Sequence, residues 1–162
     1  MTRRIATYVV LGILAIVVQK FFDDFASISS ISPELVILFV VFVTLREGQM
    51  VGMEAGFVTG FLNDILSTHF LGFTSFIAVV ASFVAGFFYK EADVDLTGRT
   101  LNYVWICAIA LFVSEFVSIP IVSAGELNYW YVFLKFTVGE TVYTALLAMV
   151  VVFVNGRKSR YV

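Results

Sequence analysis

The chain has 162 residues, of which 60% are hydrophobic and 14% are charged, against about 25% charged residues in an ordinary soluble domain. Together with a mean hydropathy of +0.99, this composition argues against a water-soluble globular domain and predicts an integral membrane protein. The net charge of −2 offers no basic surface for nucleic acid. The single cysteine, Cys107, excludes an intrachain disulfide and a cysteine-based zinc site.

Six apolar stretches follow one another along the chain, each close to the roughly 20 residues that a transmembrane helix needs. They run over 5–22, 33–46, 49–67, 70–89, 101–122 and 131–154. We therefore predict an all-α polytopic membrane protein, a single domain over residues 1–162 built as a bundle of six transmembrane helices. Arg3 and Arg4 precede the first stretch, which we interpret as an uncleaved anchor because no small-residue cleavage site follows it.

The second stretch begins with Ser32-Pro33-Glu34. This pattern is typical of a helix N-terminus, with a serine cap, a proline at the first helical position and an acid near the positive end of the helix dipole. We therefore predict that this helix begins at Pro33.

Lysines and arginines determine the predicted orientation, because loops rich in them stay in the cytoplasm. With a cytoplasmic N-terminus, only Lys20 and Lys135 would lie on the outer side. The other basic residues would lie inside: Arg3, Arg4, Arg46, Lys90, Arg99, Arg157, Lys158 and Arg160. Both termini are thus expected in the cytoplasm.

The third stretch carries a row of small residues. In GQMVGMEAGFVTGFLNDILS, residues 48–67, a glycine or an aspartate recurs at every fourth position and would line one side of a single helix. The row consists of Gly48, Gly52, Gly56, Gly60 and Asp64. Small residues at this spacing favour close helix packing in lipid. We interpret the row first as packing inside the bundle; a partner-helix groove formed by these five residues and a solute path are the alternatives.

Acidic residues within the predicted spans form a second candidate site. Asp64, Glu115 and Glu140 would share the outer half of the membrane with Lys135, while Glu54 would lie nearer the inner half. Charges inside a membrane are costly, so this intramembrane polar cluster should be hydrogen-bonded or partly protonated. Hydroxyl groups for such bonds belong to Ser114, Ser118, Thr137, Thr141 and Tyr143. Fixing helix register is the first interpretation; proton or cation coupling and partner recognition are the alternatives.

The sequence contains no motif that predicts an enzyme. His69 is the only histidine, and no nucleophile motif surrounds any serine. There is no GxxxxGK[ST] phosphate-binding loop, and the acids are spread over four predicted helices. We expect a non-enzymatic protein without a metal or cofactor.

The segment GQMVGMEAGFVTGFLNDILSTHFLGFTSF resembles the central signature of the rod shape-determining protein MreD family. In that family a glycine-spaced helix runs into G-x-x-x-D, followed by a short turn and Leu-Gly at the start of the next helix. The matching residues are Gly52, Gly56, Gly60, Asp64, Leu71 and Gly72. The preceding PELVILFVVFVTLREG, the chain length and the six spans also agree. The motif covers about residues 33–89, so Glu115 and Glu140 inherit no role from the resemblance.

The resemblance implies a membrane scaffold of the elongation (rod) complex in the bacterial inner membrane. Such a protein would bind the transmembrane and juxtamembrane region of MreC and act indirectly with MreB, RodA and a penicillin-binding transpeptidase. It would thereby position side-wall peptidoglycan synthesis and maintain rod shape. The family is also distantly similar to substrate-binding subunits of energy-coupling-factor vitamin transporters, which makes small-solute uptake the alternative. Membrane lipid is a further expected partner, because Lys90, Arg99 and the C-terminal NGRKSRYV form a basic fringe.

Overall fold

The computed structural model describes residues 2–25, 33–67, 70–91, 101–122 and 137–158. Within these ranges the chain forms helices and contains no strand. The helices are α1 (Thr2–Phe25), α2 (Leu35–Glu47), α3 (Gln49–Leu66), α4 (Phe73–Gly86), α5 (Leu101–Val122) and α7 (Gly139–Lys158). Each predicted apolar stretch overlaps one of these helices, although α1, α2 and α7 extend past the predicted bounds. The prediction of an all-α fold is therefore confirmed for the described residues.

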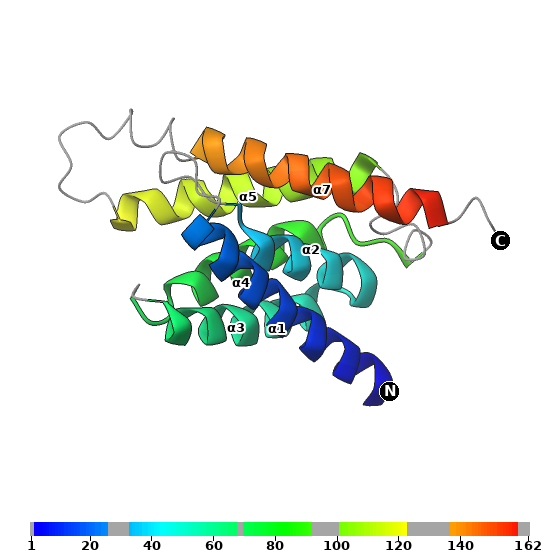
Figure 1. The fold of residues 1–162 in the computed structure, drawn as a ribbon, viewed down its shortest axis with the longest axis horizontal. Coiled ribbons are helices and arrows are strands. Elements are labelled where there is room, and N and C mark those ends of the chain that lie inside the picture. The colour runs from blue at the N-terminus through cyan, green and yellow to red at the C-terminus, as the bar shows by residue number, and fades with distance from the viewer. Residues whose placement is uncertain (1, 26–32, 68–69, 92–100, 123–136, 159–162) are drawn as a thin grey trace.

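The second helix, α2, lies at the centre of the bundle. Its sequence, LVILFVVFVTLRE, has almost no polar face, and a helix that is apolar all round is stable only when it is buried. Val36, Val40 and Val41 are 0% exposed, and α2 contacts each of the other five helices described. Figure 1 shows α5 and α7 running side by side, α3 on the opposite side of the molecule and α1 crossing in front, while α4 contacts both α3 and α5.

Helix length separates α5 from the shorter inner helices. Within the described residues, one segment is long and apolar enough to cross a membrane: Leu101–Ser118 of α5, 18 residues with a mean hydropathy of 1.7. Shorter apolar stretches occur at Thr7–Phe22, Phe73–Gly86 and Gly139–Phe153. At 1.5 Å per residue the 13 residues of α2 extend over only about 20 Å, less than a hydrocarbon core of about 30 Å. The prediction of six complete crossings stays a prediction.

Large apolar side chains cover the outside of the helices. Val10 is 64% exposed, Met50 76% and Trp105 69%. Polar side chains lie inside, where Thr44 and Ser82 are both fully buried. Exposed apolar patches of this kind mark surfaces that contact lipid or other proteins, and this distribution agrees with the predicted membrane protein.

Side chains from two other helices cap the N-terminus of α2. The helix begins at Leu35, two residues after the predicted Pro33, and Glu34 at the N-cap position makes no side-chain cap; Ser32, the predicted cap, lies outside the described residues. Instead, the Val36 N–H donates to Gln19 Oε1 of α1 at 2.9 Å. The Glu34 N–H donates to Thr144 Oγ1 of α7 at 3.0 Å. These bonds satisfy amide groups that the first turn of a helix leaves without intrahelical acceptors.

Candidate functional site

The predicted glycine row lies on the inner face of α3. Gly52, Gly56 and Gly60 are buried, whereas Phe57 and Val58 on the opposite face are more than half exposed. The four-residue spacing therefore identified residues that share a face, as expected for 3.6 residues per turn.

Gly48 does not belong to this face. Its φ of 97° places it in the turn between α2 and α3, in a region that residues with a Cβ rarely adopt. Its N–H donates to the Thr44 carbonyl oxygen at 2.9 Å. The prediction that Gly48 begins the row is wrong, because α3 starts at Gln49. Gly48 instead ends one helix and starts the next.

The chain's own helices cover the rest of the row. A Cβ added at Gly52 would lie 2.7 Å from the Cβ of Thr44 on α2, and one added at Gly56 would lie 3.0 Å from the Ala78 carbonyl oxygen on α4. At Gly60 the distance to the Cα of Ser75 on α4 would be 2.5 Å. Such distances leave no room for a side chain, so the glycines permit the backbones of α3 and α4 to approach closely.

Hydrogen bonds tie the start of α3 to the end of α4. The Ser82 hydroxyl lies 3.1 Å from the Gly52 carbonyl oxygen and 2.7 Å from that of Ala78. Gln49 Nε2 donates to the Phe83 carbonyl oxygen at 2.9 Å. In an apolar environment such bonds replace the hydration that the polar groups would otherwise lose.

Asp64 caps the N-terminus of α4. Its Oδ2 accepts hydrogen bonds from the N–H of Gly72 at 2.9 Å and of Ser75 at 3.3 Å, and its Oδ1 accepts one from the Thr74 N–H at 3.1 Å. The Ser75 hydroxyl also lies 3.3 Å from Oδ2. A carboxylate at a helix N-terminus is favoured both by the free amides and by the helix dipole. Asp64 is 1% exposed, so protein groups replace its water.

These contacts give the matched motif a physical role. Gly60 brings α4 close to α3, and Asp64 then reaches the first amides of α4. Gly72 has a left-handed φ of 92°, and no side chain of its own caps the helix. In this structure α2 and α4 already fill the face formed by Gly52, Gly56 and Gly60, and a partner-helix groove along it stays a prediction. The arrangement instead agrees with packing inside the bundle.

The predicted polar cluster does not form around Asp64. Both oxygens of Asp64 face α4, rather than a cation or another acid. Glu115 is 8% exposed, and its Oε2 accepts a hydrogen bond from the Ser118 hydroxyl at 3.1 Å. Glu140 lies in the first turn of α7, and Lys135 lies outside the described residues.

Several hydroxyl groups that were expected to donate hydrogen bonds to the acids of this cluster do not bind them. The Ser114 hydroxyl donates to the Leu111 carbonyl oxygen on its own helix. In the part of the chain that the structure describes, Thr137 Oγ1 and Thr141 Oγ1 are buried without a hydrogen-bond partner. The Ser118 hydroxyl does bind a cluster acid, since it donates to Glu115 Oε2.

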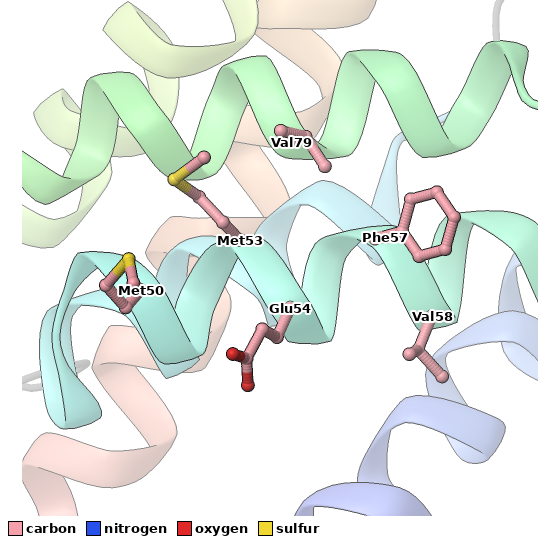
Figure 2. A pocket seen from close by; sticks show the side chains of 6 residues that line it. All are labelled: Met50, Met53, Glu54, Phe57, Val58 and Val79. Carbon is pink, nitrogen blue, oxygen red and sulfur yellow. The ribbon is translucent and has the colours of Figure 1, made fainter.

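A shallow apolar groove lies on the outer face of α3, beside α4. Its volume is about 420 Å³. Five lining residues come from α3 and one from α4: Met50, Met53, Glu54, Phe57, Val58 and Val79. Figure 2 shows the Glu54 carboxylate projecting away from the helix between the methionines on one side and Phe57 and Val58 on the other. Within the described ranges, no group of three or more His, Cys, Asp or Glu side chains could hold a metal ion.

Several residues of the site were not singled out from the sequence. Gln49, Thr44 and Ser82 all contact the glycine face or its helix ends. Thr and Ser at a helix interface are a usual means of linking helices in lipid, but the sequence alone does not show which of many hydroxyls faces α3. Glu54 was placed by depth, and its outward direction became visible only in the structure.

These features define a class of protein: a small all-helical bundle with an apolar exterior, in which a glycine-faced helix and the helix after it are joined by an aspartate cap. The family model of rod shape-determining protein MreD matches residues 2–155, so the chain belongs to the MreD family. The resemblance inferred from the motif is confirmed, and membership implies a role in rod shape determination. No curated protein and no solved structure matches the chain.

Proposed function

We propose that this protein is a multi-pass scaffold of the bacterial inner membrane, with both termini in the cytoplasm, that acts in the elongation complex without catalytic activity. In this proposal it binds the transmembrane and juxtamembrane region of MreC. Through MreC it acts with MreB, RodA and a penicillin-binding transpeptidase to position side-wall peptidoglycan synthesis.

The family match over nearly the whole chain is the observation that carries this proposal. The structure supports a membrane scaffold in two further ways. Large apolar side chains face outward on every described helix except the central α2, and they include Leu14, Phe83 and Phe153. Buried polar side chains such as Asp64 and Ser82 hold helices together instead of lining a cavity.

The partner's helix is expected on an exposed apolar face. The buried glycine face of α3 is already covered by α2 and α4, so a second protein could reach it only by separating these helices. The outer face of α3 needs no such rearrangement, because Met50, Phe57 and Val58 are exposed there.

The alternative function, uptake of a vitamin-type solute, requires convergent polar and aromatic groups in a pocket. The groove beside α3 is lined by apolar side chains except for Glu54. Equilibrium binding of the purified protein to a panel of vitamins tests this alternative; sub-micromolar affinity for any of them would favour transport over the scaffold.

Affinity purification from native membranes in mild detergent tests the scaffold proposal. The tagged chain should retain MreC, whereas an unrelated multi-pass protein of similar size should not. Depletion of the chain should convert rods to rounder cells. Absence of MreC from the purified material, together with normal rods after depletion, would contradict the proposal.

A further inference from the structure

Glu54 is an exposed acid on an apolar helix face. It lies in the interior of α3, and its neighbours on that face include Met50 at 76% exposure, Phe57 at 57% and Val58 at 55%. Further along the same helix the rings of Phe57 and Phe61 stack with their centroids 6.1 Å apart. The outer face of α3 is therefore an apolar strip with one carboxylate, opposite the face that carries the glycines.

No residue of the described chain partners this carboxylate. Among the described residues, no hydrogen bond or ion pair involves the Glu54 side chain. The other acids of the inner helices are used, since Asp64 caps α4 and Glu47 accepts a hydrogen bond from the Tyr8 hydroxyl. Ionisable residues within a membrane normally pair with one another or face a bundle interior, because a charge in contact with lipid is costly. The Glu54 carboxylate thus lacks, among the described residues, the pairing partner that an ionisable group in a membrane normally has.

The groove around Glu54 has the shape and chemistry to receive a helix. Its walls are formed by two methionines, an aromatic ring and two valines. Methionine side chains are flexible and polarisable, so they adapt to a partner's surface. The groove spans residues 50 to 58 of α3, about 12 Å along the axis, which is a little over two helical turns of a partner running beside it.

We propose that this groove binds a membrane-spanning helix of another protein that carries a lysine or arginine opposite Glu54. Charge complementarity selects this occupant. A second copy of the chain meeting this face symmetrically would bring two Glu54 carboxylates together, and anionic lipid headgroups would also be repelled. A cationic side chain instead neutralises Glu54 where both are out of water, and its long stem packs along the groove.

The inference deepens the proposed function by naming the binding face and the chemistry of the partner, and it takes its orientation from that function. With Gln49 at the cytoplasmic end of α3, Glu54 lies five residues, or about 7–8 Å, inside that end. A lysine or arginine near the cytoplasmic end of the partner's helix can reach this depth.

Synthetic peptides test the groove without MreC. Four leucine-based transmembrane helices would differ only at one position about 8 Å inside the cytoplasmic end, occupied by Lys, Gln, Leu or Glu. Binding to the full chain in lipid nanodiscs would be measured by energy transfer between a donor at the protein's N-terminus and an acceptor on the peptide. The Lys peptide should bind about tenfold more tightly than the Leu peptide, the scale of a polar contact between helices in membranes.

Substitutions then assign this preference to Glu54. Glu54→Gln should remove the preference for Lys, and Glu54→Lys should transfer it to the Glu peptide. Glu91→Gln, which changes an exposed acid outside the groove, should leave the preference intact. Equal binding of all four peptides, binding of none, or a Lys preference that survives Glu54→Gln would overturn the inference. Energy transfer between two labelled copies that disappears in Glu54→Gln would also overturn it, in favour of self-association.

The two proposals can fail separately. If the peptides show no preference for Lys but MreC still co-purifies with the chain, the groove proposal is rejected and the scaffold proposal stands. If the Lys peptide binds selectively but MreC is absent from the native purification, the groove proposal stands and MreC is rejected as the partner.

Discussion

Replacing Asp64 with asparagine should destabilise the protein by weakening the junction between α3 and α4. The carboxylate accepts hydrogen bonds from three backbone amides at 2.9–3.3 Å. Asparagine offers one oxygen and an amide group, so its NH₂ would face an N–H donor of α4. Loss of a side-chain cap costs about 1 kcal/mol, and loss of a charge at a buried helix N-terminus costs up to about 2 kcal/mol. We expect a free energy of unfolding lower by about 2 kcal/mol.

Thermal unfolding in mild detergent measures this effect. For a chain of this size, about 2 kcal/mol corresponds to a Tm lower by about 4–8 °C. Glu54→Gln is the matched control, because it makes the same chemical change on the same helix, at an exposed side chain without a hydrogen bond among the described residues. Its Tm should stay at the wild-type value. Equal Tm values for the two variants would refute the capping role of Asp64.

Three other substitutions test the packing and the caps. Gly60→Ala would place a Cβ 2.5 Å from the Cα of Ser75, and forcing the backbones apart should cost about 1–3 kcal/mol; an unchanged Tm would disprove the close approach. Gln19→Leu removes the acceptor of the Val36 amide, so hydrogen exchange at Val36 should become faster, and unchanged protection would contradict the cap. Tyr103→Phe removes a 2.8 Å hydrogen bond to a buried carbonyl of α2 and should lower the free energy of unfolding by about 1 kcal/mol. An unfolding midpoint in urea or denaturing detergent equal to that of the wild type would contradict this.

The helices were predictable because lipid-compatible segments must be apolar, and few other patterns produce such long apolar runs. The spacing of Gly52, Gly56 and Gly60 also fixed their common face. It did not identify the neighbour that fills this face, because a small-residue strip serves internal and external helices equally well. Gly48 follows Arg46 and Glu47 at the end of α2, where a terminal glycine is typical. Because Gly48 also fits the four-residue spacing of the row, its position at the end of α2 was not recognised from the sequence.

The caps could not be predicted from local sequence. Asp64 accepts hydrogen bonds from amides 8 to 11 residues further along the chain, and α4 packs closely against α3 at Gly60. The cap on α2 depends on Gln19 and Thr144, which lie on helices distant in sequence. Pro33 and Glu34 showed a helix start nearby, but capping by other helices depends on how the bundle packs.

The cap supplied by Thr144 has a consequence for biosynthesis. The α3–α4 junction joins neighbouring residues and can form soon after they emerge from the ribosome, whereas Glu34 and Thr144 are 110 positions apart. At about 5–20 residues per second, the acceptor for the Glu34 amide is made roughly 5–20 s after its donor. The central helix is therefore the second to be synthesised, yet its N-terminus is completed only when the last helix arrives. A nascent chain halted before α7 would keep its helical hairpin and leave that amide exposed, a difference by which quality-control proteases could distinguish unfinished copies from finished ones.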